Sequence, residues 1–159
     1  MVHGSRSMTA ASSATADDRG APSLPSSYAV TVKRTFPGSP DQVARVREFV
    51  RLVLGPVPAV DEVVLLASEL ATNAVIHTAS GQGGSFDVAA SRYPSAVRVE
   101  VHDAGSHQVP MPRPQDQLTE EGRGLGLVSL MADRWGHRED MDGRSVFIEL
   151  SWQLPIEGQ

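Results

Sequence analysis

Two neighbouring runs of alternating apolar residues constrain the fold of this chain more than any other feature. SFDVAASRY at 85–93 and AVRVEVHD at 96–103 are separated only by Pro94 and Ser95. Alternation with a period of two predicts strands that bury one face, and so short a turn makes the two strands antiparallel neighbours. The chain is therefore expected to contain an antiparallel sheet.

The remaining elements follow from periodicity and from turn residues. In chain order we expect a strand at 28–36, helices at 39–54 and 61–79, a loop at 104–121, a helix entered through GRGLGLVSLMADRW at 122–135, and a last hairpin formed by 134–140 and 144–152. The first helix is expected to have Ser39 as its N-cap and to end at Gly55-Pro56. The last hairpin is expected to turn at Met141-Asp142-Gly143.

The order of these elements predicts an α+β fold. Strands occur in consecutive pairs, which indicates a two-layer α/β sandwich with one mixed, mostly antiparallel sheet and about three helices on one face. The pattern lacks the βαβαβ alternation of a doubly wound nucleotide-binding fold, so that class is disfavoured.

Composition and charge narrow the class of protein. The chain has 159 residues, a net charge of −5 and no cysteine. Disulfides and thiolate metal sites are therefore excluded, and no direct binding to nucleic acid or to a membrane is expected. Residues 1–26 are poor in large apolar side chains and predict a disordered tail, whereas 27–159 form the single domain. No secretion signal or membrane-spanning run is visible, so a cytoplasmic location is expected.

The second expected helix carries three polar residues in an apolar run. Glu69, Asn73 and His77 lie four residues apart in ASELATNAVIHT. On a helical wheel Glu69 and Asn73 fall between the core stripe and the side marked as wet by Ser68 and Thr72. One interpretation is a cleft that holds a polar ligand or a cation, since polar groups among apolar neighbours need partners. The other is a surface row, with His77 as a satisfied core residue.

Two further stretches support the cleft. Asp103 ends an alternating strand in VHDAGS, and its carboxylate can accept a hydrogen bond from an exocyclic amine, with Gly105 allowing a close approach. In EGRGLGL, three glycines precede a helix, where free N–H groups bind phosphate and Arg123 adds a cation. Taken singly, the first motif is also compatible with a simple turn and the second with a hinge.

Together the three stretches resemble the N, G1 and G2 boxes of the GHKL, or Bergerat-fold, ATP-binding superfamily. SELATNAVIH resembles the N box, VHDAG the G1 box and EGRGLGLVSLMADRWG the G2 box, and DGRSVFIEL resembles the closing strand. The resemblance covers roughly residues 28–154. The branch most similar to this chain is that of the stand-alone anti-sigma-factor serine kinases.

The resemblance implies a role for each candidate residue. Asn73 would coordinate the Mg²⁺ that bridges the ATP phosphates, and Glu69 would be the general base toward a substrate serine. Asp103 would bind the adenine amine, and the loop at 104–121 would be the ATP lid. The other nucleotide-binding positions implied are His77, Gly105, Gly122, Arg123, Gly124, Leu125, Gly126 and Ser145. Ser145 falls where the family often has a threonine near the adenine.

The resemblance also implies partners. A sigma factor and an STAS-type anti-sigma-factor antagonist, phosphorylated on serine, would bind this chain, and a homodimer is expected on the same ground. The alternative is a non-catalytic ATP-binding module that sequesters a partner. A histidine-kinase catalytic domain is disfavoured, because only His3 precedes the expected domain and no helical pattern accompanies it. A gyrase- or chaperone-type ATPase would require a second domain.

Overall fold

The computed structural model describes residues 29–77, 83–104 and 120–156, with the backbone only for 77, 120–125 and 140. Five strands and three helices occur in this part of the chain. In chain order they are β1 (Val30–Pro37), α1 (Gln42–Leu54), α2 (Val60–His77), β2 (Ser85–Tyr93), β3 (Ala96–Asp103), α3 (Glu120–Met131), β4 (Arg134–Asp140) and β5 (Gly143–Ser151).

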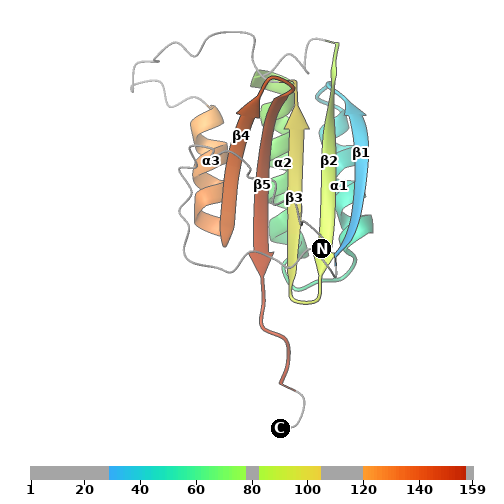
Figure 1. Cartoon of the computed structure of the whole chain (residues 1–159), viewed down its shortest axis with the longest axis vertical. Helices are drawn as coiled ribbons and strands as arrows, with labels where there is room; N and C mark the ends of the chain where they lie inside the picture. Colours follow the sequence, from blue (N-terminus) through green and yellow to red (C-terminus); the bar gives the residue numbers. More distant parts are fainter. Residues whose placement is uncertain (1–28, 78–82, 105–119, 157–159) are drawn as a thin grey trace, which may run out of the picture.

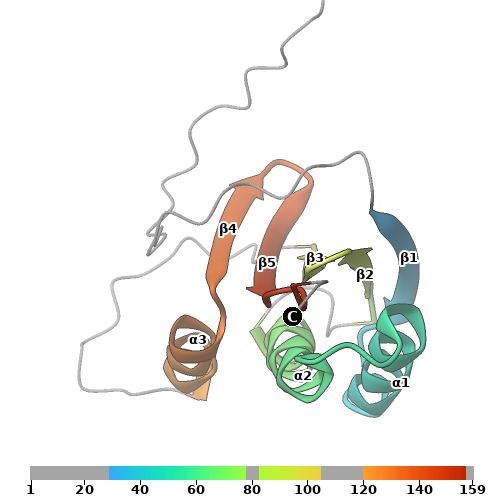
Figure 2. The ribbon, with the colours of Figure 1, turned by 90° about the horizontal axis from the view of Figure 1, so that it is seen from below.

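The strands form one sheet in the order β1-β2-β3-β5-β4, and every neighbouring pair is antiparallel. Figure 1 shows that the last hairpin lies beside β3 with β5 inside and β4 at the edge. The three helices cover one face of this sheet, with α2 between α1 and α3 (Figure 2). These two layers confirm the α+β sandwich expected from the sequence. No described helix is long and apolar enough to cross a membrane.

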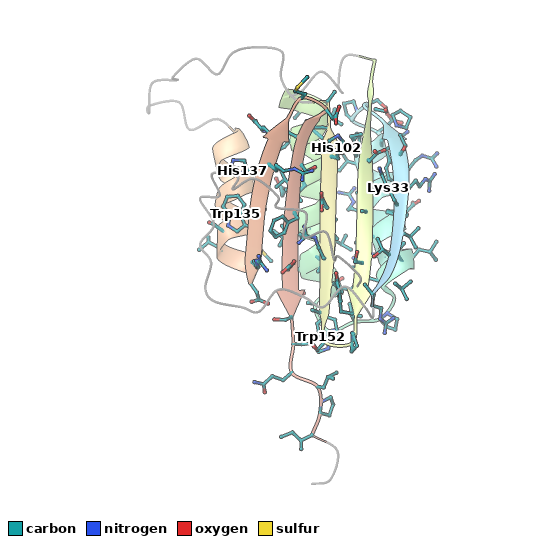
Figure 3. All side chains as sticks on the ribbon, viewed as in Figure 1. Lys33, His102, Trp135, His137 and Trp152 are labelled. Atoms are coloured by element: carbon teal, nitrogen blue, oxygen red, sulfur yellow. The ribbon has the colours of Figure 1, made fainter. Side chains whose placement is uncertain are left out.

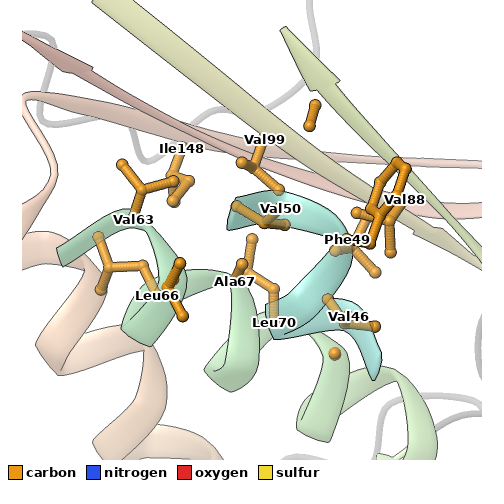
Figure 4. Close-up of a cluster of buried hydrophobic side chains, with 14 of the residues drawn as sticks. Val46, Phe49, Val50, Val63, Leu66, Ala67, Leu70, Val88, Val99 and Ile148 are labelled. Atoms are coloured by element: carbon orange, nitrogen blue, oxygen red, sulfur yellow. The ribbon is translucent and has the colours of Figure 1, made fainter. Parts of the chain in front are cut away.

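The core fills the space between the helices and the sheet. Alternate residues of β2, β3 and β5 point toward the helices and are buried there, as period two requires. Figure 4 shows them against apolar side chains of α1 and α2. The labelled members are Val46, Phe49, Val50, Val63, Leu66, Ala67, Leu70, Val88, Val99 and Ile148.

The start of α1 differs from the expectation. The helix begins at Gln42, its flanking residue is Asp41, and no side chain caps it. Ser39 is therefore not the N-cap, because a preceding turn, closed by the bond from Gln42 N to Ser39 O at 3.0 Å, separates it from the helix. The predicted end is confirmed, since Gly55 follows the last residue with φ 65° and donates its N–H to Arg51 O.

The other two helices also correct expected boundaries. The described part of α2 ends at His77, so the expected extension to Ala79 lies outside the described residues. The third helix begins at Glu120, before the glycine-rich stretch that was expected to precede it. Of the expected loop at 104–121, residues 105–119 lie outside the described residues.

Gly143 lets β5 pass closely over the end of β3. It has φ 135°, and a Cβ built there would lie 1.9 Å from the carbonyl oxygen of Asp103. Neither the backbone angle nor the contact tolerates a side chain. This glycine therefore sets how closely the β4–β5 turn approaches Asp103, a residue of the candidate site below.

Replacing this glycine should destabilise the fold by both effects. Gly143→Ala is expected to lower the free energy of unfolding by about 2 kcal/mol or more, from strain plus the backbone clash. Gly83→Ala is the matched control, because Gly83 has φ 84° but nothing within 4 Å of a built Cβ. Thermal unfolding of the two variants should show a clearly larger loss for Gly143→Ala, and equal losses would contradict the close approach described here.

Candidate functional site

The polar row of α2 lies where the helix crosses the sheet. Asn73 is only 9% exposed and Glu69, one turn earlier, is half-buried. Leu70 lies between them and packs into the core. The apolar packing of α2 on β3 thus holds an amide and a carboxylate at the border of the core, where polar groups need partners.

The exposed side of α2 is not the one expected. Ser68 is buried, and it donates its hydroxyl to Val64 O at 2.9 Å, while Thr72 donates to Ser68 O at 2.8 Å. Because these hydroxyls are satisfied within the helix, they can be packed against neighbouring elements. Leu65 and Ile76 are the exposed large residues of this helix instead.

Asp103 provides the second charged group of the site. It is the last residue of β3 and is 2% exposed. Directly opposite on β5 is Arg144, whose Nε lies 3.7 Å from Asp103 Oδ2. A buried carboxylate requires such compensation, so the cation of Arg144 stabilises Asp103 in place.

Asn73 and Asp103 line the same cavity, whose volume is about 110 Å³. The cavity lies between α2 and strands β3, β4 and β5, and its walls combine apolar side chains with polar and charged ones, as ligand sites commonly do. The lining residues are Leu70, Asn73, Val101, Asp103, His137, Glu139, Arg144 and Val146. Glu69 is not among them and lies one helical turn from Asn73.

The structure does not bring Ser145 into this cavity. Ser145 lies on the opposite face of the sheet, where its Oγ is 2.8 Å from Nδ1 of His102, its cross-strand neighbour. Its place beside Asp103 is taken by Arg144, because consecutive residues of a strand point to opposite faces. The sequence contained the information needed to place Arg144. Val146 and Ile148 show that the even-numbered residues of β5 face the helices, and Arg144 is one of these residues.

His102 and Ser145 belong to a separate, open groove of about 350 Å³ on the helix-free face. Figure 3 marks His102 on β3 and Lys33 on β1, which also line it. Asp87 lies between them and is held by Lys33 at 3.0 Å and by Thr35 at 2.5 Å. Burial opposes the charged form of Asp87, but these hydrogen bonds outweigh it, so the pKa of this carboxyl lies below its ordinary value.

Within the glycine-rich stretch, the residues up to Leu125 are described in their backbone only. Gly122, Arg123, Gly124, Leu125 and Gly126 all lie within α3, which begins at Glu120. Only the first four N–H groups of a helix lack partners within it, so Gly122 and Arg123 remain in the first turn, whereas Gly124 and Gly126 do not. The side chains of Arg123, Leu125 and His77 and the whole of Gly105 lie outside what the structure describes.

The polar side chains that line the cavity are of the types that bind a nucleotide. Asp103 can accept from an amine, and Asn73 offers one amide oxygen to a cation. Nε of Arg144 is buried and has no hydrogen-bond partner among the described residues, which leaves donor capacity at the cavity. No three His, Asp or Glu side chains of the described ranges come together as a cation site. Any Mg²⁺ at Asn73 would therefore take most of its ligands from phosphates and water.

Comparison with known proteins agrees with this geometry. Residues 36–150 match the model of the histidine kinase-like ATPase domain. Over 92 residues the chain is 34% identical to the uncharacterized protein SCO4941 of Streptomyces coelicolor. The aligned segment covers 57% of this chain and 86% of that protein. The segment 36–150 that matches the family model includes α1, α2, β2, β3, α3, β4 and all but the last residue of β5, so it contains both Asn73 and Asp103. The chain belongs to the histidine kinase-like ATPase domain family, for which ATP binding is expected.

Proposed function

We propose that this protein is an ATP-dependent serine kinase of the anti-sigma-factor type. The observation that carries the proposal is the arrangement on α2. Glu69 is half-buried one turn from Asn73, and Asn73 lines a cavity whose opposite wall holds the buried carboxylate of Asp103. A base next to a cation ligand is what phosphoryl transfer to a hydroxyl requires.

Each residue has a distinct task in this mechanism. Asp103 would bind the amine of the adenine, and Asn73 would coordinate Mg²⁺ through its amide oxygen. Bound ATP with Mg²⁺ supplies the transferable phosphoryl group and neutralises its charge. Glu69 orients the hydroxyl of a partner's serine and accepts its proton as the oxygen becomes a nucleophile. Because transfer of this kind depends chiefly on positioning, the rigid packing of α2 on the sheet serves the reaction directly.

The proposed partners follow from the resemblance of the three motifs to the anti-sigma-factor kinases. An STAS-type antagonist would present the serine, and this protein would itself sequester a sigma factor in the cytoplasm. The acidic character of the chain, with a net charge of −5, supports protein partners rather than nucleic acid.

A second candidate function is a non-catalytic ATP-binding module. It is favoured by the fact that Glu69 does not line the cavity, whereas Asn73 and Asp103 do. Nucleotide binding would then regulate a partner complex without chemistry. Phosphorylation of a serine on a partner protein distinguishes the two functions, because only the kinase transfers a phosphoryl group.

Loss of the amide of Asn73 should weaken binding of Mg-ATP. Asn73→Ala is expected to raise the Kd by about tenfold or more in the presence of Mg²⁺, because one ligand of the cation is lost. The effect should be smaller for ATP with EDTA. Thr72→Val is the control, since the Thr72 hydroxyl donates to Ser68 O within α2 and Thr72 is not among the residues that line the cavity. Calorimetry on the wild type and both variants, each with Mg²⁺ and with EDTA, measures these affinities. An Asn73→Ala protein that is folded and binds Mg-ATP with native affinity would refute the assigned role.

Loss of the base should separate binding from chemistry. Glu69→Gln is expected to keep the Kd for Mg-ATP within about twofold but to reduce transfer of radiolabelled γ-phosphate to an STAS-type partner by about 10²-fold or more. Glu62→Gln, on the exposed first turn of the same helix, is the charge-matched control and should change neither. Native transfer by Glu69→Gln would remove Glu69 from the mechanism. Native nucleotide binding by the wild type without transfer to any STAS-type protein of the host would favour the non-catalytic module.

A further inference from the structure

Three charged residues form a row across the sheet beside the nucleotide cavity. Asp103 on β3 is directly opposite Arg144 on β5, and Arg144 is directly opposite Glu139 on β4. All three line the cavity. Arg144 thus occupies the middle strand of the row, with its Nε 3.7 Å from Asp103 Oδ2, and it lines the cavity where the family resemblance implied the hydroxyl of Ser145.

The contact between Arg144 and Asp103 is an ion pair rather than a complete hydrogen bond. Nε lies 3.7 Å from Oδ2, beyond the distance of a direct bond, and it has no hydrogen-bond partner among the described residues. The Arg144 side chain is 20% exposed, and that of Asp103 is 2% exposed. Charge attraction therefore holds the guanidinium near the carboxylate while leaving donor capacity on the guanidinium.

We propose that Arg144 is a specificity-determining residue of the nucleotide pocket, donating a hydrogen bond to the ring nitrogen that flanks the amine bound by Asp103. The inference rests on the proposed binding of ATP at this cavity. Adenine presents its 6-amino donor between two ring acceptors, N1 and N7. A carboxylate next to a guanidinium presents the complementary pair, an acceptor beside a donor, and a bond from a charged donor is among the stronger ones.

An acceptor on the ligand would also give Nε of Arg144 the hydrogen-bond partner that it lacks among the described residues. A buried donor without a partner is unfavourable, and a ring nitrogen placed beside Asp103 would satisfy the guanidinium after a small rotation of its side chain. In the unliganded protein the same side chain compensates the charge of Asp103. Arg144 thus serves the fold without ligand and the recognition of the base with it.

The test compares ATP with 1-deaza-ATP and 7-deaza-ATP, which keep the amine but lack one ring acceptor each. Calorimetry on the full wild-type chain should show a roughly tenfold weaker Kd for one of the two analogues, which identifies the ring nitrogen that is bound. Equal Kd values for all three nucleotides would overturn the proposal, and this comparison needs no variant.

The variant Arg144→Met tests whether Arg144 is the residue that discriminates between ATP and the deaza analogue. It keeps the apolar stem of the side chain and removes every hydrogen-bond donor. This variant should bind ATP roughly tenfold more weakly and should no longer discriminate between ATP and the analogue. Arg138→Met is the matched control, because Arg138 lines the groove on the opposite face, and it should discriminate as the wild type does. Full discrimination by Arg144→Met would overturn the proposal.

Two safeguards keep the outcomes separable. If Arg144→Met unfolds because Asp103 loses its partner, the double variant Asp103→Asn/Arg144→Met removes the buried charge as well, and its ratio of Kd values should likewise be close to one. If the wild type binds no ATP at all, the proposed function fails and this inference with it. If ATP binds and neither deaza analogue is weaker, only this inference fails.

Discussion

The antiparallel pairing of β3 with β5 is the constraint on which the site depends. It sets Asp103 opposite Arg144 and His102 opposite Ser145. Because neighbouring residues of a strand face opposite sides, the first pair lies under the helices and the second lies on the open face. A slip of β5 by one residue would turn its side chains to the other face, which would remove Arg144 from the side of Asp103 and expose Val146 and Ile148. Gly143, at the start of β5, allows the close contact with the Asp103 backbone that accompanies this register.

Much of the fold could be predicted from the sequence, because its elements have strong periodicity. The alternating runs that became β2 and β3 begin and end as expected, and the turn at Met141 and Asp142 closes the last hairpin. The boundaries that failed were those set by local hydrogen bonds rather than by burial. Ser39 has the residue type and spacing of a cap, but the turn that precedes α1 leaves Asp41 in the flanking position.

The candidate site was predictable in part, for a related reason. Asn73 and Asp103 are polar residues in apolar segments, a signal that a sequence displays openly, and both line the cavity. Arg144 was missed because a surface arginine and a cavity arginine look alike in a sequence, and only the parity of β5 separates them. Ser68 was placed on the wet side because its type suggests exposure, whereas its bond to Val64 O allows burial. His137 and Glu139 were missed because RWGHRED has no apolar alternation that would mark its buried face.

The Asp103–Arg144 ion pair contributes little to the stability of the fold by itself. Removing two charges from water opposes folding, and apolar residues of similar volume often serve a core better. At 3.7 Å the two groups do not even form a direct hydrogen bond, so the geometry is not optimised for the fold. A ligand that offers a donor to the carboxylate and an acceptor to the guanidinium would give Nε of Arg144 the hydrogen-bond partner that it lacks among the described residues. Burying these charges is unfavourable in the unliganded protein. Binding of the ligand would remove part of this unfavourable free energy and would thereby increase the affinity of the complex. On this reasoning the polar end of the cavity is explained by recognition of a base edge, and its apolar walls, Leu70, Val101 and Val146, by the flat ring beside it.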